Sequence, residues 1–134
     1  MIVVDVNILA YFLMPCEYTA LAQDVFIKDS EWAVPVLWLS EFRNILAGYI
    51  RCRGMQVHVA LEAILRAEKI FRGREYAVPN KEVMDMVLKS PCSAYDCEYV
   101  ALAKALNISL ITADKQLIKC FPDVAIALHN YIKS

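Results

Sequence analysis

The stretch AYDCEYVALAKALNISLITAD, residues 94–114, predicts a helix, a tight turn and a buried strand with an acid near each end. Asp96 lies in the first turn of the predicted helix, and Asp114 follows the predicted strand. A helix that packs on the strand it precedes runs antiparallel to it, so the helix start and the strand end share one edge of the sheet. The two carboxylates are therefore expected to be neighbours where open α/β sheets bind ligands.

Two further acids are expected at the same edge. Residues 2–4 form an apolar run of strand type that Asp5 follows, and residues 32–34 form a second such run. Pro35 then opens a long helical pattern that carries Glu41. At roughly 1.5 Å of rise per residue, Glu41 is only about 8 Å along the axis from the helix start. Four carboxylates from four separate segments are thus predicted to converge.

The remaining patterns continue the alternation of strands and helices. Helices are predicted over residues 8–13, 17–28, 36–53, 56–71, 81–88 and 115–120, and weaker strands over residues 76–78 and 124–128. Gly54 and Ser93 are the expected C-terminal and N-terminal caps of two of these helices. Strand runs without period-two alternation favour a parallel sheet covered on both faces. The expected fold class is α/β, in a single domain of residues 1–134.

Composition favours a soluble protein that associates with itself. The chain of 134 residues is 59% hydrophobic, and its mean hydropathy is +0.41. A single domain of this size cannot hide so much apolar surface, so part of it is expected in a subunit interface. No Lys or Arg precedes Lys28, which argues against a signal peptide, and no apolar run approaches the roughly 18 residues of a membrane span. A cytoplasmic location is expected.

The cysteines also favour a cytoplasmic location. Their number is odd and they form no CxxC pair, so reduced thiols are expected. Neither His58 nor His129 falls at zinc-ligand spacing from a cysteine pair. The five residues are Cys16, Cys52, Cys92, Cys97 and Cys120.

The net charge of −1 neither favours nor excludes a nucleic-acid partner, but the distribution of charge is uneven. Residues 42–74 hold seven basic and two acidic side chains, an excess of five positive charges. A basic segment beside an acidic pocket suits a polyanion bound at a metal site, although a solvated helical face is an equally good explanation. Arg43, Arg51 and Arg53 are the candidate substrate-binding residues.

Four crowded carboxylates require an explanation of their own. They repel one another, and some would take up protons near neutral pH unless a cation lay among them. Oxygen ligands without nearby Cys or His indicate Mg²⁺ or Mn²⁺, which can acidify a bound water and neutralise charge on a phosphate. Hydrolysis of a phosphodiester is the reaction this site fits best. Asn7, Asn44 and Thr112 are candidates for orienting a carboxylate or a bound water.

Each acid also has a purely structural interpretation. Asp96 and Asp114 stand where helix caps are expected, and Glu41 is explained equally well as an exposed helix residue. Asp5 ends a strand and is not expected to cap a helix. Four unrelated caps would not be expected to converge on one edge, and this convergence favours the functional interpretation.

The motifs also carry a family resemblance. Residues 2–7 (IVVDVN), 41–44 (EFRN), 95–103 (YDCEYVALA) and 110–114 (LITAD) resemble the PIN-domain nucleases, and among them the VapC-type toxins of bacterial and archaeal toxin–antitoxin pairs. The resemblance covers nearly the whole chain. It implies a three-layer α/β/α sandwich, Mg²⁺- or Mn²⁺-dependent cleavage of RNA, a homodimer and inhibition by a small antitoxin. The residues that match the family's catalytic and metal-binding acids are Asp5, Glu41, Asp96 and Asp114, with Asn7 and Thr112 at its adjacent polar positions.

Other classes with acids at this edge fit less well. A receiver domain needs an acidic pair after the first strand, but Val6 follows Asp5. A phosphatase of the haloacid-dehalogenase type needs a second aspartate where Asn7 stands. A non-catalytic RNA-binding or assembly module on the same fold remains an alternative, and the motifs leave open which RNA, or whether a DNA flap, is the substrate.

Overall fold

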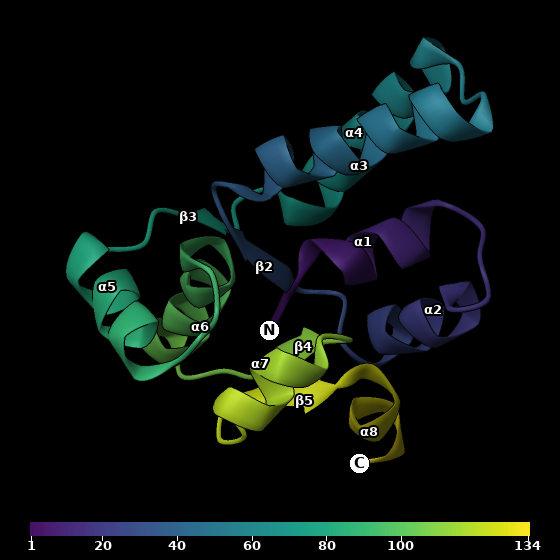
Figure 1. Cartoon of the computed structure of the whole chain (residues 1–134). Helices are drawn as coiled ribbons and strands as arrows, with labels where there is room; N and C mark the ends of the chain where they lie inside the picture. Colours follow the sequence, from purple (N-terminus) through teal and green to yellow (C-terminus); the bar gives the residue numbers. More distant parts are fainter.

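The computed structural model describes all 134 residues, which form five short strands and eight helices (Figure 1). The strands are β1 (Ile2–Val4), β2 (Trp32–Pro35), β3 (Glu75–Tyr76), β4 (Leu110–Thr112) and β5 (Ala125–Ala127). The helices are α1 (Val6–Leu13), α2 (Thr19–Lys28), α3 (Trp38–Arg53), α4 (Val57–Phe71), α5 (Asn80–Lys89), α6 (Ala94–Leu106), α7 (Lys115–Cys120) and α8 (Leu128–Lys133).

All five strands are parallel and lie in the order β3-β2-β1-β4-β5. The chain moves outward from β1 to β3 and then returns to add β4 and β5 on the other side of β1. The connections therefore reverse direction between β1 and β4, which pair through Val3 with Leu110 and Val4 with Ile111. In open α/β sheets, ligands bind beside the carboxyl ends of strands at such a reversal. The segments that follow β1 and β4 begin with the predicted acids.

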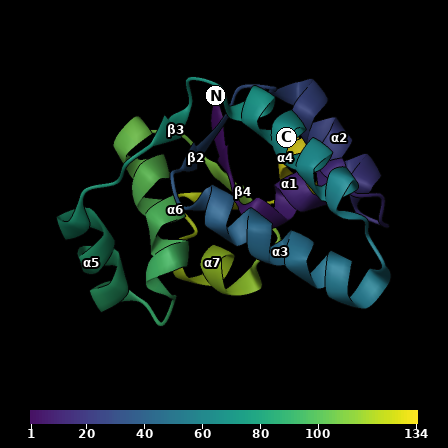
Figure 2. The same ribbon diagram turned by 90° about the horizontal axis from the view of Figure 1, so that it is seen from above.

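Helices cover both faces of the sheet. Helix α6 packs on β1, β2 and β4 with α5 outside it, while α1 and α4 cover the opposite face. Figures 1 and 2 show α5 and α6 on one side of the strands, and α1, α2 and the α3–α4 hairpin on the other. The predicted three-layer α/β/α sandwich with a parallel sheet is confirmed. None of the helices combines the length and apolarity that a membrane crossing requires.

The central strands are buried on both faces. Val3, Val4, Leu110 and Ile111 have no exposed surface. A strand between two helical layers needs an apolar side chain at every position, because both faces of its pleat meet a core. This is the physical reason why the strand runs lack an alternating pattern.

The capping residues at the two ends of α6 set the geometry of residues 94–114. Ser93 is the N-cap, as predicted, and its Oγ accepts a hydrogen bond from the Asp96 amide at 3.1 Å. Asn107 ends the helix in the left-handed region with φ 56°, a conformation that a short polar side chain tolerates. The chain then enters β4 within three residues. Gly54, with φ 66°, likewise ends α3 as predicted.

Three predicted boundaries are wrong in instructive ways. Helix α1 begins at Val6 rather than at residue 8, because Asp5 caps it. Helix α3 begins at Trp38, since Pro35 belongs to β2, and Glu41 consequently lies in its first turn. The final strand ends at Ala127 rather than at residue 128, and the residues after it form α8.

Candidate active site

The structure places the four predicted acids at the carboxyl edge of the sheet. Asp5 joins β1 to α1, and Asp114 lies between β4 and α7. Glu41 is in the first turn of α3, which follows β2, and Asp96 is in the first turn of α6. All four segments begin or end at this edge because the strands are parallel and each helix runs antiparallel to the strand it covers.

Asp5 is the most buried of the four, with 6% of its surface exposed. Its Oδ1 accepts hydrogen bonds from the amides of Asn7 and Ile8, both at 3.1 Å, and its Oδ2 accepts one from the hydroxyl of Thr112. Burial raises the pKa of Asp5 to about 6, more than these hydrogen bonds lower it, and the charge of Asp96 adds to the rise. The expectation that Asp5 caps nothing is wrong, since it is the N-cap of α1.

Glu41 is half-buried and is held by a residue from another helix. Its Oε1 accepts a hydrogen bond of 2.7 Å from the hydroxyl of Tyr99. Burial raises the pKa of Glu41, as do the charges of Asp96 and Asp5, while the hydrogen bond from Tyr99 opposes the rise. Burial and the neighbouring Glu41 raise the pKa of Tyr99 as well, which keeps its hydroxyl protonated as a donor.

Tyr99 was not among the residues predicted for the site. A signal for it was present, because Tyr99 lies three residues after Asp96, and residues at that spacing share a helix face. Its aromatic ring belongs to the core, since only 2% of the residue is exposed. From the sequence alone, a place in the core was enough to explain Tyr99, so nothing pointed to a role in the site.

Asp96 is the acid that interacts with each of the other three. Burial raises its pKa first, and the charge of Asp114 raises it further. The charge of Asp96 in turn raises the pKa of both Asp5 and Glu41. Repulsion of this kind indicates that the carboxylates lie near one another.

Thr112 connects the two acids that follow the central strands. It is fully buried at the end of β4, donates to Asp5 and accepts a hydrogen bond of 3.0 Å from the Asp114 amide. Asp114 caps α7 through Oδ1, which accepts from the amides of Gln116 at 2.8 Å and Leu117 at 3.3 Å. Its other carboxylate oxygen has no partner within α7, so capping occupies only one oxygen of this acid.

No basic side chain compensates the four carboxylates. The ion pairs of the structure join the N-terminus to Asp29 and Lys81 to Asp85, both away from this edge. Burial raises the pKa of Asp5, Glu41 and Asp96, and oxygen donors of this kind without an ion-pair partner fit a hard divalent ion. No three of the acids lie close enough together to hold a metal ion directly. The donor set therefore suits an ion that is bound by one or two carboxylates and keeps several waters, as Mg²⁺ prefers.

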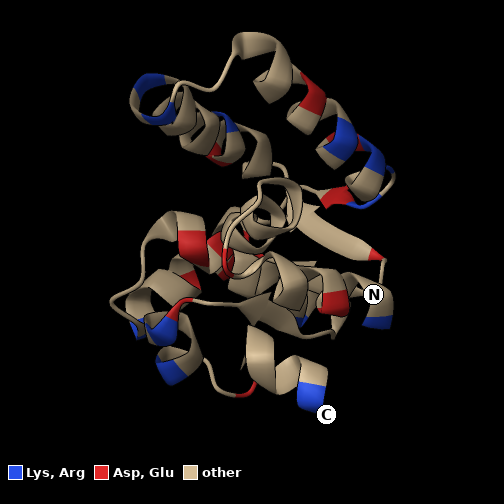
Figure 3. Cartoon of the chain, turned by 90° about the vertical axis from the view of Figure 1, so that its right-hand side faces the viewer, with Lys and Arg blue, Asp and Glu red and all other residues tan.

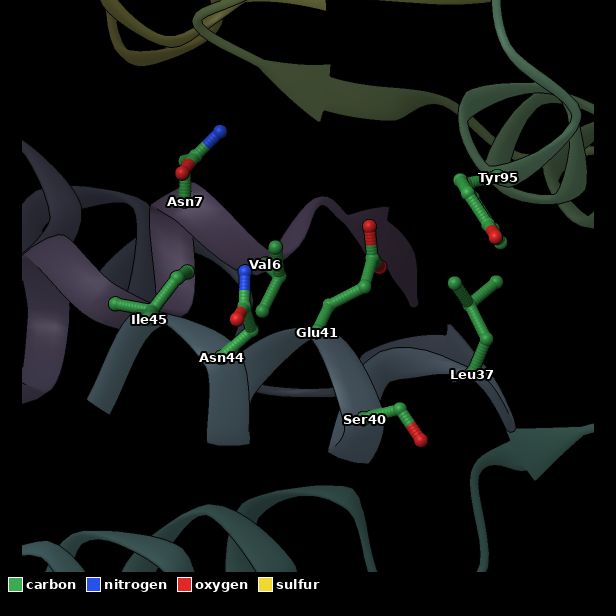
Figure 4. A pocket seen from close by; sticks show the side chains of 8 residues that line it. All are labelled: Val6, Asn7, Leu37, Ser40, Glu41, Asn44, Ile45 and Tyr95. Carbon is green, nitrogen blue, oxygen red and sulfur yellow. The ribbon is translucent and has the colours of Figure 1, made fainter. Parts of the chain in front are cut away.

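A cavity of about 640 Å³ opens in front of Glu41. Asn7 and Asn44 line it from α1 and α3, and Tyr95 faces Leu37 across it (Figure 4). Both asparagines are exposed, so their amides are available to a ligand. The predicted polar neighbours of the acids thus lie beside a space large enough for a nucleotide.

The predicted substrate-binding arginines are not brought to the acids. Arg43 lines a separate groove between α3 and α4, together with Leu46 and Ile50. Arg51 and Arg53 are exposed in the last turn of α3, about 15 Å along the helix axis from Glu41 at 1.5 Å per residue. Figure 3 shows the blue segments of the α3–α4 hairpin apart from the red segments near the middle of the molecule.

Two arginine side chains of residues 42–74 have structural contacts. The guanidinium of Arg53 packs on the ring of Tyr49, 4.9 Å from its centroid. Arg74 donates hydrogen bonds to the carbonyls of Ile70 at 2.6 Å and Trp32 at 3.1 Å. Arg74, which contributes to the basic excess in the sequence, therefore joins the end of α4 to β2 and is not free to bind phosphate.

Comparison with known proteins agrees with this geometry. The family named PIN domain matches residues 2–125, a range that includes all four acids. Ribonuclease VapC3 of Pyrobaculum aerophilum is 30% identical over 125 residues, which are 90% of this chain and 95% of that protein.

Solved structures share the fold at lower sequence identity. The crystal structure of PAE2754 from Pyrobaculum aerophilum has a TM-score of 0.67 at 20% identity and covers 98% of this chain and 93% of its own. FitAcB from Neisseria gonorrhoeae has a TM-score of 0.73 at 16% identity, over 95% of this chain and 96% of its own. FitAB bound to an IR36 DNA fragment has a TM-score of 0.62 at 17% identity, over 96% of this chain and 95% of its own. The family match and the VapC3 relative, each spanning nearly the whole chain, show that the chain belongs to the PIN-domain family, as its motifs indicated.

Proposed function

We propose that this protein is a Mg²⁺- or Mn²⁺-dependent endoribonuclease whose catalytic and metal-binding residues are Asp5, Glu41, Asp96 and Asp114. The observation that carries the proposal is the group of uncompensated carboxylates at the reversal point of the sheet. RNA as the substrate is supported by the ribonuclease VapC3 relative.

The bound ion would neutralise charge on the scissile phosphate and acidify a water. The residues of the chain fix the acids around it. Thr112 and the first amides of α1 hold Asp5, while Tyr99 holds one oxygen of Glu41 and leaves the other free. The exposed amides of Asn7 and Asn44 can donate hydrogen bonds to the sugar or phosphate of the bound strand.

Association is a further part of the proposal. Large apolar side chains lie exposed on α4, among them Val57, Val59, Leu61 and Leu65. A contiguous apolar surface of this kind is typical of a subunit or partner interface. We expect a cytoplasmic homodimer that acts as the toxin of a toxin–antitoxin pair and is inhibited by a small antitoxin protein.

The test of the function is cleavage of labelled RNA by purified protein. We expect cleavage with Mg²⁺ or Mn²⁺, no cleavage with EDTA, and none by the variant Asp96→Asn. The matched control is Asp24→Asn, which removes an exposed carboxylate from α2 and should leave cleavage unchanged. Cleavage that survives EDTA would contradict the metal-dependent mechanism. RNA binding without cleavage under any of these metals would favour the alternative, a non-catalytic RNA-binding module.

A further inference from the structure

A second cavity shares no lining residue with the one in front of Glu41. It has a volume of about 280 Å³, and Thr112 and Tyr11 line it together with Tyr18, Lys115 and His129. It opens where β4 and β5 end, since Thr112 and Ala127 are the last residues of these strands. The cavity therefore belongs to the same edge of the sheet as the four acids.

Asp5 is hydrogen-bonded to one lining residue of each cavity. One carboxylate oxygen accepts from the amide of Asn7, which lines the larger cavity, and the other accepts from the hydroxyl of Thr112, which lines the smaller. The charge of Asp5 also raises the pKa of Tyr11, after burial of the ring. Through these two bonds, a catalytic acid is connected to both cavities.

The lining of the smaller cavity differs in charge from that of the larger one. It includes Lys115 and His129 but no Asp or Glu, whereas Glu41 lines the larger cavity. Lys115 takes part in no ion pair, so its charge is available to an anion. The charge of Lys115 and the absence of acids favour a negatively charged group.

Two tyrosine rings provide an aromatic wall. Tyr11 and Tyr18 pack with their centroids 4.9 Å apart and their planes inclined by 39°. Tyr18 is 42% exposed, which leaves part of its ring free for a further contact. Aromatic faces combined with free cations are the means by which proteins bind unpaired nucleotides. The volume lies just below that of pockets for drug-sized ligands, so it suits a single nucleotide.

We propose that this cavity binds one unpaired nucleotide of the RNA, adjacent to the scissile phosphodiester, with the base against Tyr18 and a phosphate near Lys115. The proposal rests on the proposed function, because it is the acids that define which phosphodiester is cut. It makes single-stranded RNA the preferred substrate, since a base that is paired and stacked in a duplex cannot enter the cavity.

The experiment measures binding of a fluorescein-labelled single-stranded RNA by anisotropy, using Asp96→Asn as the parent so that RNA is not cut. In this parent, Tyr18→Leu is expected to weaken binding roughly 5- to 150-fold, the range for one lost base–aromatic stack. Tyr18→Phe keeps the ring and should bind like the parent. Lys115→Gln should lower the slope of log affinity against log salt by about 0.7, as for one phosphate of a single strand.

Controls separate this effect from charge and folding. Lys104→Gln removes an exposed lysine from α6 and should leave both affinity and slope unchanged. Duplex RNA should bind Tyr18→Leu and the parent equally. Thermal unfolding checks that each variant is folded, which is expected because Tyr18 is largely at the surface.

The outcomes distinguish this inference from the function itself. If Tyr18→Leu and Lys115→Gln bind RNA like the parent while the unmodified protein cleaves RNA, the cavity is not a nucleotide site and the ribonuclease proposal stands. If both variants lose binding but the unmodified protein cleaves no RNA with either metal, the nucleotide site is supported and the nuclease assignment fails.

Discussion

The hydroxyl of Thr112 donates a hydrogen bond to Oδ2 of Asp5 and joins the ends of the two central strands across 107 positions of sequence. The hydroxyl oxygen of Thr112 also accepts a hydrogen bond from the Asp114 amide. Because Thr112 is fully buried, no water is available to replace either bond. One side chain thus fixes the positions of two of the four acids.

Replacement of Thr112 by Val should destabilise the protein by about 1–3 kcal/mol, the cost of leaving a buried polar group without its partner. The volume of the side chain is nearly unchanged, so the effect reports the hydroxyl rather than a cavity. Thermal or urea unfolding measures it. Thr112→Ser, which keeps the hydroxyl, is the matched control and should lose less stability; an equal loss in both variants would assign the effect to packing of the methyl group.

The stability of the metal-free protein should fall as pH rises from 4 to above 6. Asp5 has a pKa of about 6 in the folded protein against an ordinary value of 3.8, so the folded state binds more protons within this window. The difference in pKa corresponds to a loss of about 3 kcal/mol in the free energy of unfolding. This loss is fully present above pH 6 and absent below pH 4. Urea unfolding in EDTA at several pH values measures it.

Asp5→Asn is the matching variant for this pH dependence. It should be more stable than the unmodified protein at pH 7.5, should lose most of the pH dependence between pH 4 and 6, and should not cleave RNA. The asparagine side chain of the variant keeps an oxygen that accepts from the α1 amides. Its NH₂ group can donate to the hydroxyl oxygen of Thr112. If Asp5→Asn is instead less stable at pH 7.5, the ionised carboxylate stabilises the fold as the cap of α1, and the expected cost of burying its charge is contradicted.

Tyr99→Phe should reduce cleavage while the fold is retained. The change removes the hydrogen bond to Glu41 and leaves the buried ring in place, so Glu41 loses both its orientation and a contact that lowers its pKa. A loss of about 1 kcal/mol of stability is expected from one hydrogen bond. Cleavage kinetics across pH provide the measurement, and the activity should require a higher pH. Tyr131→Phe, on α8, is the control, and an unchanged pH profile in Tyr99→Phe would contradict a positioning role for Tyr99.

Arg51→Ala combined with Arg53→Ala should weaken binding of different RNAs about equally. The two side chains lie at the end of α3 remote from Glu41, so they can contact only flanking phosphates, which carry no sequence information. The salt slope should fall by about 0.7 for each lost contact with a single strand. Lys89→Ala with Lys104→Ala removes the same charge from the α5–α6 side and should have a smaller effect. Equal effects of the two pairs would indicate a general loss of charge rather than a binding surface.

The protein should be a dimer at micromolar concentration, and Leu61→Asp with Leu65→Asp should shift it toward the monomer. Both leucines are more than half exposed on α4, and burying a charge at an apolar interface is unfavourable. Light scattering after size exclusion measures the mass. Leu88→Asp, at a still more exposed leucine on α5, is the control. If only this control dissociates the dimer, the interface lies on the α5 side.

The sequence by itself determined the fold class and the positions of the acids along the elements. Residues 2–4, 110 and 111 are apolar because both faces of each strand are covered; Asp5 follows the first strand directly, and Asp114 lies two residues after Thr112, the last residue of β4. Ser93, Gly54 and Asp114 act through backbone groups a few residues away. Such local interactions are complete within a short segment, so a single sequence suffices to predict them.

Only the tertiary structure decided which side chains meet across elements. The bond from Tyr99 to Glu41, the bond from Thr112 to Asp5, and the distance of Arg51 and Arg53 from the acids all depend on how separate helices and strands pack. The burial that raises the pKa of Asp5 comes from the same packing. A sequence pattern shows which edge of a sheet a residue approaches. The orientation of its side chain is fixed by neighbours from distant segments, because close packing leaves the side chain only one set of partners.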